Sequence, residues 1–277
     1  MKIARGPIFP SARLIDKMKI NFTKSNGTQN HFLIIHSNDK SIHDKNAIVK
    51  IVKGSKVGRI DGVLILSDSD SVDFKMDYYN NDGTWETMCA NGARCAALYM
   101  YDKNLVTSEK MTFEAGDGNH EAEIIGANNV KLKMTTPKYC SDKIDLLGVS
   151  GFHIDSGATH FAVEYNNIDN DKVKDLGSKI RYDKIFEPRG INVNFYEVIN
   201  SHEISVKTYE KGIEDLMMSC GSGSVACAFH LSKVGAIESP VHVHVIGGKL
   251  QIDFEKDWQN VWISGHAEIE DDLSIKI

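Results

Sequence analysis

The 277-residue sequence lacks the features that would place it in several large protein classes. Its opening residues carry Lys and Arg but no apolar stretch of the kind that a secretory signal peptide requires. No apolar run approaches the roughly 18 residues of a membrane span. Basic runs and interleaved basic and aromatic residues are absent, and the net charge is −6. We therefore expect a soluble, cytoplasmic protein with neither a nucleic-acid nor a membrane partner.

Disulfide and metal patterns are missing too. The five cysteines are an odd number in a chain without a secretion signal, which argues against a disulfide framework. No CxxC or HExxH spacing occurs, so we expect no metal. His242 and His244 would share one face of a strand, which is more typical of a partly exposed strand than of a metal site.

Most of the chain alternates between apolar and polar residues, as half-buried strands do. No low-complexity or proline-rich linker divides the sequence, whose composition is that of an ordinary globular protein. The length suits one large domain or two smaller ones. The predicted strands cover residues 31–36, 61–68, 71–80, 110–116 and 129–136, and then 151–166, 191–199, 203–210, 241–254 and 260–270.

Two segments break this alternation in the same way. Residues 90–104 and 221–235 are small-residue turns followed by Ala-rich apolar stretches, which predict helices. Each segment directly follows a cysteine, Cys89 or Cys220, and these two lie 131 positions apart, close to half the chain. Weak internal duplication is the simplest explanation. It predicts two mostly β halves with one central helix each and a boundary near residue 140.

A cysteine at a helix start favours chemistry over packing. The first helical turn leaves backbone N–H groups unpaired and carries partial positive charge, which lowers a thiol pKa and binds carboxylates. Two such units facing each other suit proton transfer at the α-carbon of an amino acid, with one thiolate as base and the opposite thiol as acid. We expect this role for Cys89 and Cys220, and a structural role for the other cysteines, Cys95, Cys140 and Cys227.

The residues around both cysteines resemble the diaminopimelate epimerase family. Its first motif, Cys-Gly-Asn-Gly-x-Arg-Cys, is similar to CANGARC at residues 89–95. Its second, Tyr-Glu-Arg-Gly and then Ser/Ala-Cys-Gly-Thr/Ser-Gly, is similar to YEKG at 209–212 and SCGSG at 219–223. The match runs in family order from about Met18 to the C-terminus. Five further anchors lie at Asn30 with Phe32, Asp61-Gly62, Asn80 with Asp82-Gly83, His160, and Asn192.

The resemblance implies a fold and a chain division. The expected fold is α/β, with two pseudo-twofold-related domains, each a curved, mostly antiparallel sheet or barrel around a central helix, and the active site between them. Residues 1–17 would form an N-terminal extension, residues 18–140 the domain with Cys89 and residues 141–277 the domain with Cys220. No cofactor is implied, neither pyridoxal phosphate nor metal. The partner would be a small amino-acid substrate; the oligomeric state stays open, a homodimer included.

The resemblance also implies site roles. Cys89 and Cys220 would be the two bases, with His160 assisting one thiol and Glu210 the other as proton-accepting neighbours. The backbone N–H groups of Ala90 and Asn91, and of Gly221 and Ser222, would hold the reacting carboxylate. The remaining predicted substrate-binding residues are Asn30, Asn80, Asn192 and Lys211.

Several positions depart from the family pattern. Ala90 replaces a Gly and adds a methyl group at a tight approach, and His31 replaces an Asp. Ala158-Thr159 replaces Asn-Pro before His160, which removes an amide near the substrate. Lys211 replaces an Arg that grips the distal end of diaminopimelate, and Lys lacks the planar two-pronged geometry of Arg. Leu216-Met217 stands where Glu-Thr is usual. The reaction centre is kept while its surroundings differ.

Three functional hypotheses follow. The leading one is diaminopimelate epimerase, which interconverts the L,L and meso forms for lysine or cell-wall synthesis. The alternative is a racemase or epimerase of another amino acid on the same scaffold, for instance one with a basic or imidazole side chain. A third is a non-catalytic, redox-sensing relative that uses the thiols as a switch. Retention of both cysteines together with His160 and Glu210 disfavours the third hypothesis.

Overall fold

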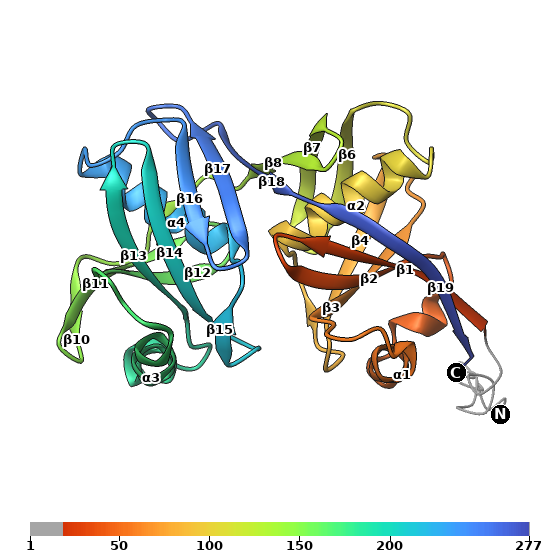
Figure 1. Ribbon diagram of the computed structural model, residues 1–277, viewed down its shortest axis with the longest axis horizontal. Coiled ribbons are helices and arrows are strands. Elements are labelled where there is room, and N and C mark those ends of the chain that lie inside the picture. The colour runs from red at the N-terminus through yellow and green to blue at the C-terminus, as the bar shows by residue number, and fades with distance from the viewer. Residues whose placement is uncertain (1–18, 277) are drawn as a thin grey trace, which may run out of the picture.

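The computed structural model describes residues 19–276, which form two lobes, each a curved sheet wrapped around a helix (Figure 1). The predicted extension, residues 1–17, lies outside the described residues. The first lobe contains β1 (Lys19–Gly27), β2 (Asn30–His36), η2 (Lys40–His43), α1 (Lys45–Ser55), β3 (Gly62–Ser67), β4 (Phe74–Asn80), β5 (Trp85–Glu86), α2 (Ala90–Asp102), β6 (Lys110–Ala115), β7 (Gly118–Gly126) and β8 (Asn129–Met134).

The second lobe has a similar order, with two further strands at its start and its 3₁₀ helix after the outer α-helix instead of before it. It contains β9 (Lys138–Tyr139), β10 (Ile144–Leu146), β11 (Val149–Asp155), β12 (Thr159–Glu164), α3 (Asn170–Arg181), η3 (Lys184–Phe186), β13 (Asn192–Asn200), β14 (Glu203–Glu210), β15 (Asp215–Met217), α4 (Gly221–Lys233), β16 (Val241–Val245), β17 (Gly248–Phe254) and β18 (Val261–His266). The last strand, β19 (Glu268–Lys276), returns to the first lobe and pairs with β1 (Figure 1).

Strand pairing shows the duplication directly. In the first lobe β2 pairs parallel with β3, β3 antiparallel with β4, β4 parallel with β6, and β6 antiparallel with β7. The strands β12, β13, β14, β16 and β17 make the same pairings in the same senses. A shift of 131 residues carries the bounds of α2 onto those of α4. The predicted fold class, α/β with two repeated halves, is therefore confirmed.

The two halves meet at an antiparallel pair. β8 of the first half pairs with β18 of the second over six residue pairs, from Met134 opposite Val261 to Asn129 opposite His266. A domain boundary near residue 140 stays a prediction. β19 crosses any such division, because it follows β18 in the chain yet completes the sheet of the first lobe.

The central helices are buried almost all round. Ten of the thirteen residues of α2 and ten of the thirteen of α4 are buried, and one hydrophobic cluster joins both helices. A helix that is apolar on every side must lie inside a core, and Ala, Gly and Ser let the strands approach closely. Cys95 and Cys227 are fully buried in these helices, whereas Cys140 is exposed on the surface.

The outer helices were not predicted. α1 and α3 cover separate hydrophobic clusters, one per lobe (Figure 1). Each is capped by an aspartate side chain that accepts hydrogen bonds from first-turn N–H groups, Asp44 for α1 and Asp169 for α3. Three long predicted strands are instead pairs of strands: a bend at Gly157 and a turn at Gly247 interrupt two of them, and the single residue Ala267 separates β18 from β19.

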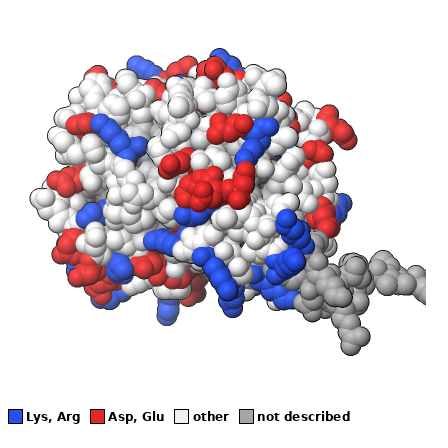
Figure 2. Space-filling view, turned by 45° about the vertical axis from the view of Figure 1, so that its right-hand side comes forward, with Lys and Arg blue, Asp and Glu red and all other residues white. Residues whose placement is uncertain are grey.

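The surface is mixed in charge. On the face shown in Figure 2, acidic and basic side chains are interspersed, with a group of Asp and Glu near its centre. Within residues 19–276, no helix has the length and apolar character that a membrane span requires.

Candidate active site

The starts of the two central helices face each other. Cys89 is the N-cap of α2 and Cys220 is the N-cap of α4, both in extended conformation, so the predicted placement of both cysteines is confirmed. The residues after them are in contact: a Cβ atom added at Gly221 would lie 2.9 Å from the Cβ of Ala90. The methyl group of Ala90 therefore fits because the residue that faces it, Gly221, has no side chain.

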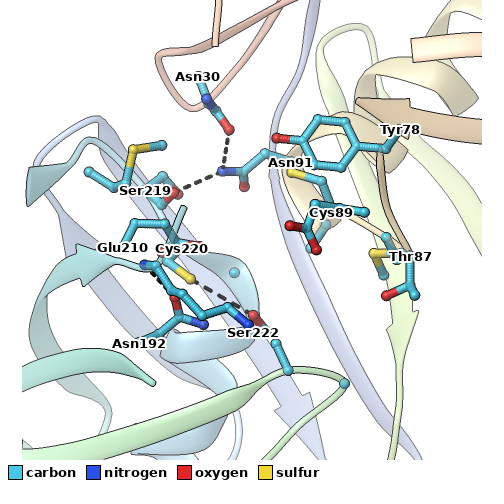
Figure 3. Close-up of a pocket in the computed structure, with 18 of the residues that line it drawn as sticks. Asn30, Tyr78, Thr87, Cys89, Asn91, Asn192, Glu210, Ser219, Cys220 and Ser222 are labelled. Atoms are coloured by element: carbon cyan, nitrogen blue, oxygen red, sulfur yellow. Dashed lines mark hydrogen bonds between the residues drawn. The ribbon is translucent and has the colours of Figure 1, made fainter. Parts of the chain in front are cut away.

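A cavity of about 140 Å³ lies between the helix starts (Figure 3). Cys89, with Tyr78 and Thr87, is on one side of the cavity, and Cys220, with Glu210 and Ser222, is on the other. Of the twelve predicted site residues, all but His160 line this cavity: Cys89, Cys220, Glu210, Asn30, Asn80, Ala90, Asn91, Asn192, Lys211, Gly221 and Ser222. Residues from widely separated parts of the chain thus converge on one small space.

The caps of the central helices differ from those of the outer ones. α1 and α3 have aspartate caps whose side chains accept hydrogen bonds from the first turn, whereas neither Cys89 nor Cys220 makes a side-chain cap hydrogen bond. The first-turn N–H groups of α2 and α4 are therefore available to a ligand at the cavity. Such a pair of helix N-termini can bind an anion such as a carboxylate.

The thiols are less acidic than the helix starts predict. Burial raises the pKa of Cys89 to about 11, although the N–H groups of Gly92 and Asn91 and the charge of Arg94 oppose it. Burial also raises the pKa of Cys220 well above its ordinary value, and the neighbouring Glu210 adds to this rise. The predicted lowering of both pKa values is wrong, because the loss of solvation outweighs the helix N-termini.

Glu210 lies beside Cys220 at the end of β14. Burial raises the pKa of its carboxyl group to about 7, while a hydrogen bond with the Cys220 thiol and the charge of Lys211 lower it. The Oε2 atom of Glu210 is buried without a hydrogen-bond partner in the described residues. A carboxylate with this pKa can accept a proton from the thiol near neutral pH.

His160 reaches Cys220 only through Ser222. Its Nε2 lies 3.0 Å from Ser222 Oγ, which in turn lies 3.8 Å from Cys220 Sγ. The imidazole is fully buried, and burial lowers its pKa to about 4, so it is neutral. We predicted that His160 and Glu210 would each serve a different thiol, but the structure places both on the Cys220 side.

Asn194 fixes the tautomer of His160. Its Nδ2 donates to Thr208 Oγ1 at 2.6 Å, so its Oδ1 accepts from His160 Nδ1 at 2.8 Å. His160 Nε2 then carries no hydrogen and accepts from the Ser222 hydroxyl. Gly223 leaves room for this arrangement, since a Cβ atom there would lie 2.1 Å from Asn194 Nδ2.

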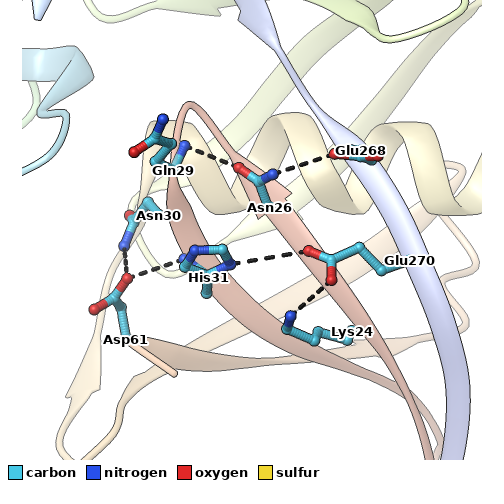
Figure 4. A network of polar contacts seen from close by, with 8 residues as sticks. All are labelled: Lys24, Asn26, Gln29, Asn30, His31, Asp61, Glu268 and Glu270. Carbon is cyan, nitrogen blue, oxygen red and sulfur yellow. Dashed lines mark hydrogen bonds and ion pairs between the residues drawn. The ribbon is translucent and has the colours of Figure 1, made fainter. Parts of the chain in front are cut away.

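The three predicted asparagines differ in how far the protein already satisfies them. Asn30 donates to Asp61 and accepts from Asn91, and Asp61 also accepts from the backbone of His31 (Figure 4). Asn192 donates to the carbonyl oxygen of Thr159 and accepts from the N–H of Lys211. These amides mainly hold the cavity walls.

Asn80 has the freest amide. Its Oδ1 accepts from the Tyr78 hydroxyl at 2.7 Å, while its Nδ2 makes no hydrogen bond within residues 19–276. That amide group lies close to Gly212, after the Glu210-Lys211 pair, on the cavity wall. Asn80 is thus the asparagine best placed to donate to a ligand.

The cavity is rich in carboxyl groups. Asp61, Glu86, Asp117 and Glu210 line it, whereas Lys211 is the single Lys or Arg among its described lining residues. Ala158 also lines the cavity and offers only a methyl group there. Ala158 and Lys211, two of the positions that depart from the family pattern, therefore both line the cavity.

Several polar residues at or beside the cavity were not predicted as site residues, and Asn194, Arg94 and Tyr78 are three of them. Asn194 lies on the same strand face as Asn192, two residues away, and this alternation is a signal that the sequence does contain. Arg94 is a charged residue in an otherwise apolar helix, and it is fully buried. Tyr78 gives no sequence signal, because tyrosine is common in strands.

Among the described residues, no group of three or more His, Cys, Asp or Glu side chains is arranged to hold a metal ion.

The sequence profile of the family described as diaminopimelate epimerase matches residues 22–140 and 152–269. The diaminopimelate epimerase of Aquifex aeolicus is 32% identical over 263 residues, which is 89% of this chain and 94% of that protein. That of Archaeoglobus fulgidus is 35% identical over 259 residues, covering 87% and 91%.

Solved structures share the fold at low identity. A hydroxyproline epimerase from Agrobacterium vitis, solved with bound trans-4-hydroxy-L-proline, superimposes with a TM-score of 0.72 at 12% identity, over 94% of this chain and 93% of that one. At this identity the likeness concerns the fold alone. The family profile and the curated relatives go further, and they confirm the family predicted from the two cysteine motifs: the chain belongs to the diaminopimelate epimerase family of pyridoxal-phosphate-independent epimerases and racemases.

Proposed function

We propose that this protein inverts the α-carbon of an amino acid by proton transfer between Cys89 and Cys220. The observation that carries the proposal is the pairing of two uncapped helix starts, each with a cysteine, on opposite sides of one cavity. One thiolate removes the α-proton, and the opposite thiol delivers its own proton to the other face. The C–H bond broken on one face is replaced by a new one on the other, and the two sulfurs exchange protonation states.

The N–H groups at both helix starts support the reacting carboxylate in this mechanism. Proton removal puts negative charge on the carboxylate as the carbanion delocalises, and the groups after Cys89 and Cys220 point where that charge grows. The substrate also supplies an α-ammonium group close to the sulfurs. Its positive charge favours thiolate, which offsets part of the rise that burial imposes on the pKa of both thiols.

Glu210 and His160 both serve Cys220 in the proposed mechanism. In the direction in which Cys220 is the base, Glu210 accepts the Cys220 proton, as its carboxyl pKa of about 7 allows. Neutral His160 accepts the hydrogen bond of Ser222 and so leaves the Ser222 oxygen free to accept from the thiol. Cys89 has no such base at contact distance in our assignment. The N–H groups at the start of α2 and the charge of Arg94 both favour ionisation of Cys89.

Diaminopimelate is the substrate that we propose first. Curated relatives at 32–35% identity over most of the chain carry that name, and Asn80, Asn192, Glu210 and Lys211 line the cavity. A second candidate is another amino acid, and one observation favours it: four carboxyl groups and a single cation line the cavity. A distal carboxylate would have Lys211 as its one cationic partner, whereas a basic or imidazole side chain would find Glu86. Of the other acids, Asp61 is already paired with Arg59 and Asp117 with His120.

A stereo-inversion screen tests the substrate. The purified protein is incubated with L,L-diaminopimelate, with meso-diaminopimelate and with a panel of single amino acids, and chiral chromatography follows each. We expect diaminopimelate to be epimerised, and the double change Ala158→Asn and Lys211→Arg to increase kcat/KM, since a regained buried hydrogen bond contributes about 1–3 kcal/mol. If diaminopimelate is inert to both proteins while another amino acid is inverted rapidly, the second candidate replaces the first.

A further inference from the structure

Arg94 is a buried cation without an acidic partner. It lies one turn into α2 and is fully buried, and no carboxylate of residues 19–276 forms an ion pair with it. Its guanidinium donates to the carbonyl of Ala90 at 3.2 Å, to Asn91 Oδ1 at 2.9 Å and to Thr28 Oγ1 at 3.0 Å. Its Nε is buried without any partner. Such a charge is costly to bury, so its retention requires a reason.

The duplicated fold shows that this reason is not helix packing. The shift of 131 residues that carries α2 onto α4 carries Arg94 onto Val225, which is also fully buried. The same helix, in the same position inside the same kind of sheet, is therefore built with an apolar residue in the second half. Arg94 is therefore one of the differences between the Cys89 side of the cavity and the Cys220 side.

Arg94 sets the orientation of the Asn91 amide. Because Asn91 Oδ1 accepts from Arg94, its Nδ2 must face the other way, where it donates to the carbonyl of Ser219 at 3.1 Å and to Asn30 Oδ1 at 3.3 Å (Figure 3). Ser219 directly precedes Cys220. A chain of hydrogen bonds thus runs from Arg94 across the cavity mouth to the backbone that carries the second thiol.

The charge of Arg94 also acts on Cys89. The groups that bear on the ionisation of this thiol are Arg94 and Cys95 from α2, Tyr78 from β4 and Glu210 from β14. Of these, Arg94 alone is positively charged, and it favours the Cys89 thiolate. On the opposite side, Glu210 disfavours the Cys220 thiolate. Glu210 also disfavours the Cys89 thiolate, but only at Cys89 does Arg94 oppose it, so the electrostatic surroundings of the two thiols are unequal.

We propose that Arg94 is a positioning residue of the reaction, which clamps the Asn91 amide against Ser219 and so holds the start of α2 against the backbone that carries Cys220, while its positive charge favours ionisation of Cys89 over that of Cys220. This inference rests on the proposed two-thiol reaction. It goes beyond that proposal because it names the residue that makes two similar halves chemically unequal. It also separates a geometric role, carried by Asn91, from an electrostatic one, carried by the charge.

The test uses site-resolved alkylation as well as turnover. Iodoacetamide labelling of Cys89 and Cys220 is followed against pH by peptide mass spectrometry, without substrate, alongside kcat and KM. Arg94→Met removes the charge and the donors, Arg94→Lys keeps the charge but not the forked contacts, and Asn91→Leu removes the clamp but keeps the charge. Thr28→Val is the matched control, since it removes one contact of Arg94 and leaves the other two.

The expected results differ for each variant. Arg94→Met moves the labelling profile of Cys89 to higher pH and leaves that of Cys220 in place. In Arg94→Lys the Cys89 profile stays near that of the parent. Arg94→Lys and Asn91→Leu both lower kcat at least about tenfold with KM nearly unchanged, as expected when transition-state geometry is lost. Thr28→Val resembles the parent in both measurements.

Two outcomes overturn the inference. One is an Arg94→Met protein in which both labelling profiles move together or neither moves. The other is an Asn91→Leu protein with the kcat of the parent. If Arg94→Met does not fold, the kcat of Arg94→Lys and of Asn91→Leu carries the test, and a parent-like kcat in either variant overturns the clamp. A parent protein that inverts no amino acid sinks the proposed function instead, and the labelling profiles still report on the charge of Arg94.

Discussion

Glu210 makes the reaction dependent on pH at the scale of a single residue. Burial raises the pKa of its carboxyl group to about 7, and only the ionised form can accept the proton of Cys220. Activity should therefore be full above this pH and fall as pH drops through about 7. We expect kcat/KM between pH 5 and 9 to show this acidic limb. Glu210→Gln should lose about 10²–10⁴-fold in rate at every pH. A parent profile that is flat from pH 6 to 8 would contradict the assignment.

Ser222 tests the indirect link between His160 and Cys220. Ser222→Ala keeps the backbone N–H at the start of α4 but removes the hydroxyl that joins Nε2 to Sγ. We expect kcat to fall about 10–100-fold with little change in KM, because the carboxylate-binding N–H remains. Ser222→Thr, which restores a hydroxyl, should recover most of the rate. Equal losses in both variants would show that the hydroxyl is not the connection.

Single residues also mark where sequence reasoning succeeds and fails. Cys89 and Cys220 could be found because their surroundings repeat, and most of their predicted neighbours line one cavity. The acidity of the thiols could not be predicted, because burial is a property of the folded molecule. Here burial raises both thiol pKa values by more than the helix starts lower them. The route from His160 to Cys220 could not be predicted either, because it depends on a tautomer fixed by Asn194.

At the scale of elements, the contact between α2 and α4 sets how closely the thiols approach. Gly221→Ala would place a new methyl group 2.9 Å from that of Ala90, which forces the helix starts apart. We expect kcat to fall by at least about tenfold, since small displacements of reacting groups are costly. Ala90→Gly removes the opposing methyl group and should restore most activity in the double variant. Failure of this rescue in a folded double variant would mean that the contact does not set the spacing.

The elements themselves were predicted unevenly. The Ala-rich helices α2 and α4 were recognised because small apolar residues follow a turn, and the alternating strands because one face is buried. α1 and α3 were missed, although Asp44 and Asp169 precede them as caps, because lysines interrupt the apolar residues of α1 and because α3 carries lysines and aspartates over much of its length. The pairing of β19 with β1 was missed because a return to the first sheet leaves no local trace.

For the molecule as a whole, the two halves should be linkable by oxidation. Cys89 and Cys220 face one small cavity, so we expect mild oxidant to join them and block turnover, and reductant to restore it. Cys140→Ser is the matched background, because it removes the exposed thiol, a competing target for the oxidant. Peptide mapping identifies the linked pair. Activity that survives oxidant while both peptides remain unlinked would contradict the prediction.

The central claim is that two thiols act from opposite faces of one α-carbon, and isotope transfer in D₂O tests it most directly. At low conversion the inverted product should carry deuterium at the α-carbon while the unreacted substrate does not, because the proton removed by one sulfur is not the one returned by the other. Cys89→Ala and Cys220→Ala should each nearly abolish inversion, and the double variant should lose no more than either, since the pair acts as a unit. Deuterium that enters substrate and product equally from the outset, or a single variant that keeps most activity, would contradict the two-thiol mechanism.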